Sequence, residues 1–275
     1  MIPLTHARGK TVLITGSTDG VGRAVALALA AAGARVLVHG RDRARGEAVV
    51  AQIAASGGEA RFYQADLASL AAVRELAAAV RRDESRLDVL INNAGLGSGT
   101  AGGARTTSAD GHELLFAVNY LAGFLLTRLL LPLLEASRPA RIVNVSSLGQ
   151  QPIDFADVML TRGYNGTRAY CQSKLAQIAF TIDLARELDG RGVTAYAVHP
   201  ATFMDTTMVR EAGAEPMSTV EEGADAILQL AVAPDVETHN GRFFNGLRPG
   251  RPHASVEDAT IRERLRVLSE ELVGA

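Results

Sequence analysis

The feature that most constrains the fold is a regular alternation of short apolar runs with longer helix-forming segments. The first apolar run, 11–15, leads into a glycine-rich turn, and helix-forming residues then continue over 21–32 and end at Gly33. Further strands are predicted at 35–39, 60–64, 89–91, 141–146, 194–198 and 242–245. Helices are predicted at 43–55, 70–82, 115–134, 168–188, 220–232 and 256–272. Strands that alternate with helices at this pace predict a parallel sheet with helices on both faces.

We therefore predict one α/β domain over 1–275, a Rossmann-type, doubly wound sheet of seven mainly parallel strands. The length is normal for one domain, 47% hydrophobic residues can fill a core, and no low-complexity linker divides the chain. In open parallel sheets, ligands bind beyond the carboxyl ends of the strands, where the strand order reverses. The segments after Ile14, Ile91, Ser146 and Val198 should therefore converge on one crevice.

The charge balance and composition of the chain limit the classes of molecule that it is expected to bind. Lys plus Arg (28) nearly balance Asp plus Glu (30), so no net field draws the chain to nucleic acid or to an anionic membrane. The most apolar stretch, 121–134, contains Arg128 and Pro132 and is shorter than the roughly 20 residues that span a bilayer. The N-terminus lacks the pattern of a secretory signal, and the single Cys171 fits a reducing compartment. We expect a cytoplasmic protein with a small-molecule partner, and a homo-oligomer is left open.

The glycine-rich turn predicts a site for the pyrophosphate of a dinucleotide. It reads Thr15-Gly16-Ser17-Thr18-Asp19-Gly20-Val21-Gly22. Glycine lets backbone N–H groups approach a phosphate closely, and the N-terminus of a helix favours negative charge. The spacing GxxxGxG differs from the GxGxxG fingerprint, and a purely structural turn is the alternative. The position between the first strand and the first helix favours cofactor binding.

The end of the second strand favours NADP over NAD. An acid at this place bonds the ribose 2′-hydroxyl of NAD and repels the 2′-phosphate of NADP. The chain has the neutral Gly40 here, followed by Arg41, whose planar cation suits a phosphate. Asp42 leaves two alternatives, because it either caps the next helix or, with a shift in register, bonds the ribose.

Tyr170 and Lys174 form a candidate acid/base pair. They lie four residues apart in a segment with helical periodicity, which places them on one face. An ammonium beside a phenol favours the phenolate and lowers its pKa from about 10 toward neutrality. The pair alone is weak evidence, because this spacing also occurs on solvated helix faces.

Taken in order, the motifs resemble the short-chain dehydrogenase/reductase family: TGSTDGVG at 15–22, NNAG at 92–95, Asn119, Ser147, and Tyr170 with Lys174. The resemblance reaches to about Phe244 and implies hydride transfer between a nicotinamide and a carbonyl or alcohol carbon, without a metal. It implies Tyr170 as the acid/base and Lys174 as the modulator of its pKa and a ligand of the ribose. It also implies Ser147 as the donor to the substrate oxygen and Asn119 as the holder of a proton-relay water.

The residues expected at the cofactor are Gly16, Ser17, Thr18, Asp19, Gly20, Val21, Gly22, Arg41, Asp66, Leu67, Asn93, Ala94, Gly95, Tyr170, Lys174, Pro200, Thr202 and Thr206. Two departures from the family pattern bear on this set. A position that is often basic in NADP-using members is Asp19, and the usual Pro-Gly after the sixth strand is Pro200-Ala201. The threonine expected at the nicotinamide is therefore Thr202, Thr206 or Thr207, and we favour Thr206.

Three polar side chains, each close in the sequence to a candidate site residue, are expected to have structural roles. Ser146 precedes Ser147 in a strand, and since adjacent residues of a strand face opposite sides, Ser146 should point into the sheet. His199 lies among apolar residues, which favours a structural histidine over a catalytic one. Cys171 is expected to pack in the core.

The segment between Ser147 and Tyr170 is longer than in compact family members, and this suggests the branch of retinol dehydrogenases and carbonyl reductases. An insertion at about 148–168 should form a wall beside the tyrosine, and a lid is expected at about 201–218. The resemblance implies a bulky, apolar ketone, aldehyde or alcohol. The candidate lining is Phe155, Met159, Phe203, Met204 and Met208, with ordinary packing as the alternative. Two other functions are considered: a catalytically idle NADP(H) sensor and a ketoreductase of acyl carrier protein.

Overall fold

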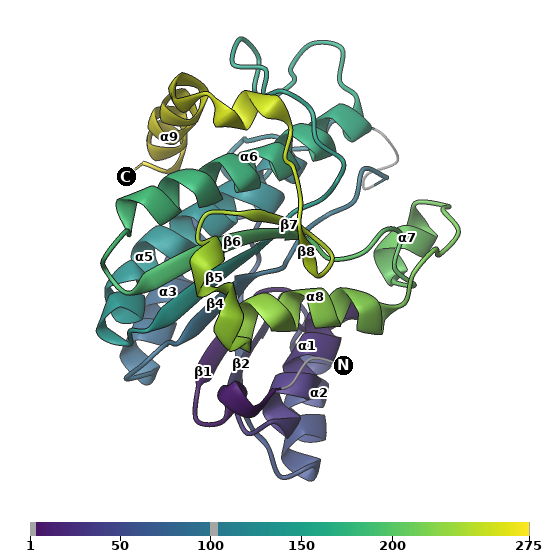
Figure 1. The fold of residues 1–275 in the computed structure, drawn as a ribbon. Helices are drawn as coiled ribbons and strands as arrows, with labels where there is room; N and C mark the ends of the chain where they lie inside the picture. The colour runs from purple at the N-terminus through teal and green to yellow at the C-terminus, as the bar shows by residue number, and fades with distance from the viewer. Residues whose placement is uncertain (1–3, 100–103, 275) are drawn as a thin grey trace.

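The computed structural model describes residues 4–99 and 104–274. In this part of the chain one sheet has the strand order β3-β2-β1-β4-β5-β6-β7-β8 (Figure 1). The strands are β1 (Thr11–Ile14), β2 (Arg35–Gly40), β3 (Glu59–Gln64), β4 (Val89–Asn92), β5 (Ala140–Val145), β6 (Val193–His199), β7 (Phe243–Asn245) and β8 (Arg248–Pro249). Neighbours from β3 to β7 pair in parallel, and the order reverses between β1 and β4. The predicted doubly wound sheet is confirmed.

The prediction of seven strands is wrong by one. The eighth, β8, pairs antiparallel with β7, with Phe244 opposite Pro249 and Asn245 opposite Arg248. It has two residues, one of them proline, and so it shows no alternation that could reveal a strand in the sequence.

Helices cover both faces of the sheet (Figure 1). One side carries α1 (Gly20–Ala31), α2 (Arg43–Ala55) and α8 (Val220–Val232), and their apolar residues form one core cluster with the sheet. The other side carries α3 (Leu70–Asp83), α5 (Ala122–Ala136) and α6 (Gly166–Glu187), with α9 (Ala259–Val273) packed against α6. The two short helices are α4 (Leu114–Phe116) and α7 (Thr207–Glu211). Every residue of β1 and β4 is buried, as expected for parallel strands between two helix layers.

A continuous helix runs through α4, a π-helical turn at Ala117–Leu121, and α5. Its 23 residues are long and apolar enough to cross a membrane, whereas the shorter stretch recognised in the sequence falls below that length. Its most apolar window is 78% buried inside the protein, against α3, β4 and α6. This burial identifies it as a core helix in the described structure.

The carboxyl ends of β1, β4, β5 and β6 lead into loops that lie together at one edge of the sheet. Thr15 and Ser17 follow β1, and their backbone N–H groups donate to Ile91 O of β4 and His39 O of β2. Ser146, after β5, donates its backbone N–H to Val198 O of β6. The predicted crevice at the reversal of strand order is therefore the place where these loops meet.

Candidate active site

Tyr170 lies in the first turns of α6, beside the loop that follows β5. Burial raises the pKa of its phenol above the ordinary value, and the hydroxyl of Ser147 acts in the opposite direction with a smaller effect. The Ser147 hydroxyl accepts a hydrogen bond from Gly149 N at 3.0 Å. A Cβ at Gly149 would lie 3.5 Å from Ser147 Oγ and 3.6 Å from Tyr170 Cε1. Gly149 therefore lies next to both hydroxyl-bearing side chains and places no side chain of its own between them.

Ser146 has a different environment from Ser147. It is buried, and its hydroxyl donates to Lys174 O at 2.7 Å, which ties β5 to α6. Cys171, the neighbour of Tyr170, is also buried, and burial raises the pKa of its thiol. These placements leave Ser147 as the serine that faces the tyrosine.

Lys174 is buried one turn beyond Tyr170. Its ammonium donates to Val145 O at 2.9 Å and to Gln177 Oε1 at 3.1 Å, and Nζ lies 5.7 Å from the centroid of the Tyr170 ring. Burial lowers the pKa of Lys174 to about 7. Lys174 is not among the groups that shift the pKa of Tyr170 in the free protein, and its role as the modulator of that pKa stays a prediction.

Asn119 lies in the π-helical turn and is buried. Its Oδ1 accepts from Leu96 N at 2.7 Å, and its Nδ2 donates to Leu96 O and to Ser173 Oγ, both at 3.1 Å. A Cβ at Gly95 would lie 3.3 Å from Asn119 Oδ1 and 3.4 Å from Lys174 Nζ, so the two side chains approach the same glycine. Both amide hydrogens of Asn119 are already used, and a water held by this residue must therefore bind to one of its oxygen atoms. Single π-helical turns inside α-helices are frequent at functional sites.

The glycine loop is closely packed against the loop after β4. Gly16 has a φ of +65°, and a Cβ on it would lie 2.8 Å from Ala94 Cα. A Cβ on Gly22 would lie 2.4 Å from both Gly16 O and Asn93 Nδ2. Both contacts require glycine, and they bring the loop to the N-terminus of α1, where backbone N–H groups favour an anion. These residues fit a dinucleotide, and they would hold its pyrophosphate.

Ser17 and Asp19, both expected at the cofactor, use their side chains inside the protein. The Ser17 hydroxyl donates to Ile14 O at 2.8 Å and accepts from His39 N at 3.0 Å, so it joins the loop to β2. The Asp19 carboxylate caps α1 by accepting from Gly20 N at 2.7 Å, and it also accepts from Thr207 Oγ1 at 3.0 Å. Arg45 lies 3.6 Å from the same carboxylate and offsets its charge. Val21 follows as a buried residue in the first turn of α1.

The end of β2 is shaped by a contact between Gly40 and Thr18. A Cβ on Gly40 would lie 2.6 Å from Thr18 Cγ2 and 2.9 Å from its Oγ1. The threonine side chain therefore occupies the space that a carboxylate side chain at 40 would need. Asp42 caps α2 by accepting from Arg45 N at 3.0 Å, which settles its two alternatives in favour of the cap. Arg41 is exposed, and among the residues that the structure describes its guanidinium pairs with no carboxylate within 4 Å.

The remaining cofactor candidates lie in the loops after β3, β4 and β6. Asp66 is exposed and accepts from Ala68 N at 3.0 Å, and the buried Leu67 follows it. The Asn93 amide donates to Thr15 O at 2.8 Å, and Ala94 N donates to Thr15 Oγ1 at 3.0 Å. These bonds hold the NNAG segment against the glycine loop.

The three threonines after β6 have separate contacts. Thr202 Oγ1 lies 3.0 Å from His199 Nε2, Thr206 caps α7, and Thr207 bonds Asp19. Thr206 also lies next to the glycine loop, since a Cβ on Gly20 would lie 3.4 Å from its Cγ2. Burial and the charge of Lys174 lower the pKa of His199 to about 4, so this histidine is neutral. Pro200 is buried beside it.

The five apolar side chains proposed for the substrate divide into two groups. Phe203 and Met208 are exposed on the segment after β6, and Leu148, next to Ser147, is exposed as well. Phe155, Met159 and Met204 pack against the core clusters instead. The guanidinium carbon of Arg264 lies 4.5 Å from the Phe155 ring centroid, and the Met159 sulfur accepts from Glu113 N.

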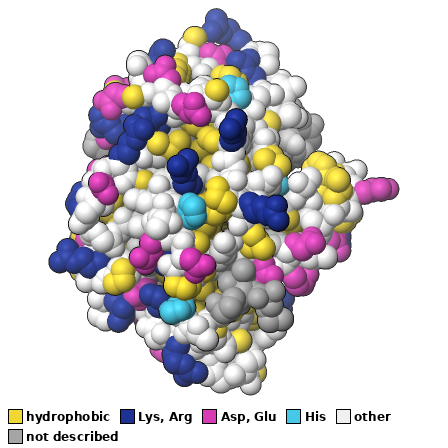
Figure 2. All heavy atoms as spheres, viewed as in Figure 1, with side chains coloured by type: hydrophobic (Ala, Val, Ile, Leu, Met, Phe, Trp, Pro, Cys, Tyr) yellow, Lys and Arg dark blue, Asp and Glu magenta, His cyan; other side chains and the backbone are white. Residues whose placement is uncertain are grey.

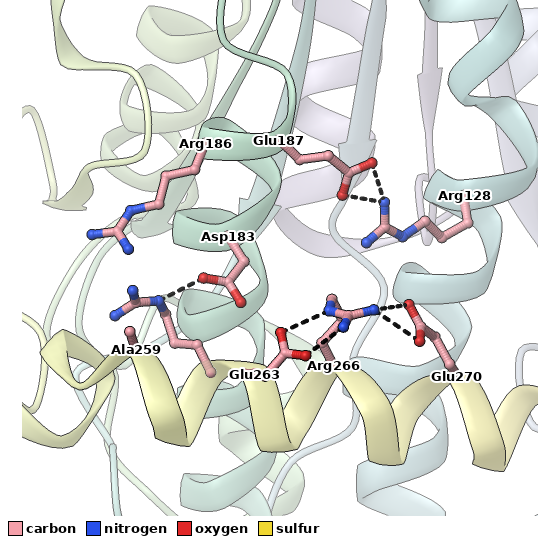
Figure 3. Close-up of a pocket in the computed structure, with 9 residues that line it drawn as sticks. Arg128, Asp183, Arg186, Glu187, Ala259, Glu263, Arg266 and Glu270 are labelled. Atoms are coloured by element: carbon pink, nitrogen blue, oxygen red, sulfur yellow. Dashed lines mark hydrogen bonds and ion pairs between the residues drawn. The ribbon is translucent and has the colours of Figure 1, made fainter.

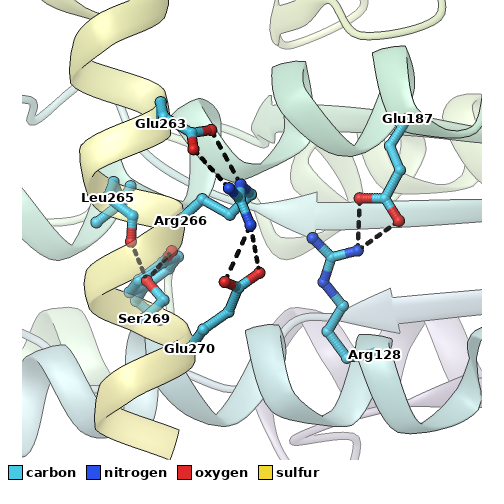
Figure 4. Close-up of polar contacts among 8 residues, drawn as sticks. Arg128, Glu187, Glu263, Leu265, Arg266, Ser269 and Glu270 are labelled. Atoms are coloured by element: carbon cyan, nitrogen blue, oxygen red, sulfur yellow. Dashed lines mark hydrogen bonds and ion pairs between the residues drawn. The ribbon is translucent and has the colours of Figure 1, made fainter. Parts of the chain in front are cut away.

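A large groove of about 670 Å³ lies away from Tyr170, between α5, α6 and α9 (Figure 3). Its lining includes Arg128, Asp183, Arg186, Glu187, Ala259, Arg262, Glu263, Arg266 and Glu270. The charges of the lining balance and mostly pair with one another (Figure 4), for example Arg128 with Glu187 and Arg266 with Glu270. The buried Arg262 bonds Asp183 and the carbonyl groups of Val256 and Glu257. The groove is therefore lined by paired charges, and the bond between Arg262 and Asp183 joins α9 to α6. The face drawn in Figure 2 likewise carries basic and acidic groups side by side.

The chain matches known proteins over nearly its whole length. A family model described as short chain dehydrogenase matches residues 10–216. This chain belongs to the short-chain dehydrogenase family. It is 39% identical to human retinol dehydrogenase 13, with 97% of this chain and 85% of the relative covered. A crystal structure of an uncharacterized protein from Mycobacterium paratuberculosis has a TM-score of 0.81 and 32% identity, with 98% and 94% of the two chains covered. The NADP complex of RhlG from Pseudomonas aeruginosa has a TM-score of 0.71 and 29% identity, with 89% and 97% covered.

Short-chain dehydrogenases are oxidoreductases that bind a nicotinamide cofactor, and the resemblance drawn from the sequence motifs is confirmed for the family and for its retinol-dehydrogenase-like branch. The motifs do not reveal Gln177, which bonds Lys174 directly. A signal for it was present, because Gln177 is a single amide in an otherwise apolar stretch of the helix, three residues after the lysine.

Proposed function

We propose that this protein is an NADP(H)-dependent oxidoreductase that acts on a carbonyl or alcohol carbon of a bulky, apolar substrate. The observation that carries the proposal is the convergence of Ser147, Tyr170, Lys174 and Asn119 beside the glycine loop. A Cβ at Gly149 would lie 3.5 Å from Ser147 Oγ and 3.6 Å from Tyr170 Cε1, and Lys174 and Asn119 both approach Gly95. A bound nicotinamide supplies or accepts the hydride.

Each side chain has a role that its surroundings support. The raised pKa of Tyr170 keeps its phenol protonated near neutral pH, the form that gives a proton to a carbonyl oxygen during reduction. Ser147 offers a second donor where negative charge develops on that oxygen. In alcohol oxidation the same phenol oxygen, once deprotonated, accepts the hydroxyl proton. Lys174 keeps one N–H beyond the two that the protein uses, and this N–H is available to a ribose hydroxyl.

The preference for NADP(H) is supported at the end of β2. A carboxylate that would bond the 2′-hydroxyl of NAD has no room at position 40 because Thr18 fills that space. Arg41 is exposed and unpaired among the described residues, so its planar cation is free for a phosphate. The Asp19 carboxylate, which would disfavour the phosphate, is engaged with Gly20, Thr207 and Arg45.

The test of the cofactor proposal is Arg41→Ala, with Arg43→Ala as the matched control. Arg43 is exposed two residues later and lies 3.4 Å from Glu47 on its own helix. A charge-assisted hydrogen bond is worth about 1.5 to 3 kcal/mol, so Arg41→Ala should weaken NADPH binding about 10- to 150-fold. NADH binding should change little, and Arg43→Ala should change neither. Equal losses for the two cofactors in a fluorescence titration would remove the support for NADP(H).

The substrate class rests on the relatives and on the exposed side chains near the site. Human retinol dehydrogenase 13 is a relative of this chain, and three apolar side chains are exposed: Leu148 next to Ser147, and Phe203 and Met208 in the segment after β6. We propose apolar ketones, aldehydes and alcohols, retinoids among them, as the compounds to screen by the absorbance of NADPH. A protein that binds NADPH but turns over none of them would be the redox sensor instead. A cytoplasmic location stays a prediction.

A further inference from the structure

The ammonium of Lys174 is held by two acceptors from different parts of the chain. Val145 O lies at the end of β5, and Gln177 Oε1 lies three residues along α6, on the same face of the helix. Nζ has three N–H groups, so these two bonds fix its position and leave one group for a ligand. Of the two acceptors only Gln177 is a side chain, and only Gln177 can be altered without changing the backbone.

The backbone at Gln177 belongs to a buried hydrogen-bond network, while its side-chain oxygen accepts from Lys174. Gln177 is 4% exposed, and its backbone carbonyl accepts from the Thr181 hydroxyl at 2.7 Å. Thr181 in turn accepts from Asn144 Nδ2, and Asn144 Oδ1 accepts from Asn92 Nδ2, both at 2.9 Å. A chain of buried hydrogen bonds thus runs from α6 into the centre of the sheet. Such a network favours one arrangement of the groups bonded within it, here with one member, Asn92, only partly bonded.

The Gln177 side chain also borders a small cavity beside the site. This cavity of about 10 Å³ is lined in part by Thr15, Asn92, Asn119 and Gln177. Asn92 Oδ1 is buried without a hydrogen-bond partner in the described structure. Apolar side chains, among them Leu67, Val118 and Leu126, complete the lining. Gln177 and Asn119 are thus two of the polar residues around one small cavity of mixed lining.

We propose that Gln177 is a positioning residue, which holds the Lys174 ammonium in place by accepting one of its three hydrogen bonds. A hydrogen bond to the charged form favours that form, so Gln177 offsets part of the burial cost of the lysine. The inference rests on the proposed function, because Gln177 orients the Lys174 ammonium that is expected to contact the ribose. It can nevertheless be tested in the free protein, where neither cofactor nor substrate takes part.

The other titratable groups that face Lys174 are Tyr170 on its own helix and His199 on β6. Tyr170 has a raised pKa and His199 a pKa of about 4, so both are uncharged around neutral pH. Changes in the titration of Lys174 near pH 7 therefore report the lysine and its hydrogen bonds, without a neighbour changing charge in the same range.

The chain offers a direct measurement because it contains two lysines, Lys10 and Lys174. Protein labelled with 13C-lysine should give two Cε signals, and Lys174→Met assigns them by removing one. The signal that disappears in this variant belongs to Lys174, and its chemical shift against pH in the protein that retains Lys174 gives the pKa of Lys174. This readout requires no turnover, so its failure is separate from a failure of the proposed function.

Two substitutions at the same position should move the Lys174 pKa in opposite directions. Gln177→Met keeps the size of the side chain and removes the acceptor, so the pKa should fall by about one unit. Gln177→Glu replaces the amide by a carboxylate, which favours the ammonium, so the pKa should rise. If Gln177→Met does not fold, Gln177→Asn retracts the acceptor and should also lower the pKa.

The control is Gln172→Met on the same helix. Gln172 is buried too, but it donates to Val158 O and accepts from Asp154 N, both in the insertion before α6. This variant should leave the pKa of Lys174 unchanged. An unchanged pKa in Gln177→Met or Gln177→Asn, or a shift of the same sign in Gln177→Met and Gln177→Glu, would overturn the assignment of Gln177.

Discussion

An aspartate at the end of β2 should lower the stability of the fold. It should change the cofactor preference only when Thr18 is also replaced. In Gly40→Asp the new Cβ would lie 2.6 Å from Thr18 Cγ2 and 2.9 Å from Thr18 Oγ1. The φ of Gly40 is not in the left-handed region, so the backbone accepts a side chain, and the three atoms nearest to the new Cβ all belong to Thr18. Thr18 cannot withdraw easily, because its neighbour Ser17 is bonded to Ile14 and His39.

The expected cost follows from this contact. Forcing extra atoms into a packed site typically costs about 1 to 3 kcal/mol. For a chain of this size, each kcal/mol corresponds to roughly 2 to 4 °C in Tm, so Gly40→Asp should lower Tm by about 2 to 12 °C. Thr18→Ala removes the two nearest atoms, and the atom then nearest to the new Cβ would be Thr18 Cβ at 3.3 Å. The double variant should therefore recover most of the loss.

The assay is a double-mutant cycle in urea, with NADH and NADPH titrations of all four proteins. The free energies of unfolding should deviate from additivity by about 1 kcal/mol or more in the stabilising direction. Binding should shift toward NADH in the double variant, because the carboxylate then has room and repels a 2′-phosphate. Additive losses would refute the contact between positions 18 and 40. A stable single Gly40→Asp variant that already prefers NADH would refute the whole line of reasoning.

Two further predictions concern the acid/base pair. Tyr170→Phe removes the proposed proton donor and keeps the ring, so kcat should fall by about 10² to 10⁴ with NADPH affinity nearly unchanged, and wild-type turnover would exclude Tyr170 as the donor. Lys174→Met should alter how stability depends on pH. The pKa of Lys174 falls from 10.5 in the unfolded chain to about 7 in the fold, so only the unfolded state binds this proton between those values. Wild-type stability should therefore rise with pH in this window relative to the variant, by at most about 1.4 kcal/mol per pH unit, and parallel urea-unfolding curves from pH 7 to 10 would contradict the burial of the amine.

The fold was largely predictable because its signals are local and repeated. Apolar runs followed by helix-forming segments indicate parallel strands in a doubly wound sheet. The misses are short or depend on distant contacts. The two-residue β8 has no period, and α7 is a helix of five residues that begins at the cap Thr206. The π-helical turn at Ala117–Leu121 has no pattern of its own in the sequence.

Residue types predicted the members of the site better than their contacts. The spacing of Tyr170 and Lys174 placed both on α6, but it did not show that the ammonium bonds Val145 and Gln177. The glycine motif suggested a cofactor role for Ser17, whose side chain joins the glycine loop to β1 and β2. Such outcomes depend on which neighbour comes within hydrogen-bond distance, and distances between remote segments are not encoded in local periodicity.

The pKa shifts at the site share one physical cause, and together they bear on the substrate. Burial raises the pKa of Tyr170 and lowers those of Lys174 and His199, so each shift favours the uncharged form. A site with so little fixed charge holds water weakly compared with a site of paired ions, and an apolar compound can enter it without displacing strongly bound water. The phenol of Tyr170 is protonated near neutral pH in the free protein, and Lys174, with a pKa of about 7, is the group whose charge is most easily changed. The acceptor on Gln177 therefore acts on the residue where a single hydrogen bond has the largest effect on the charge of the site.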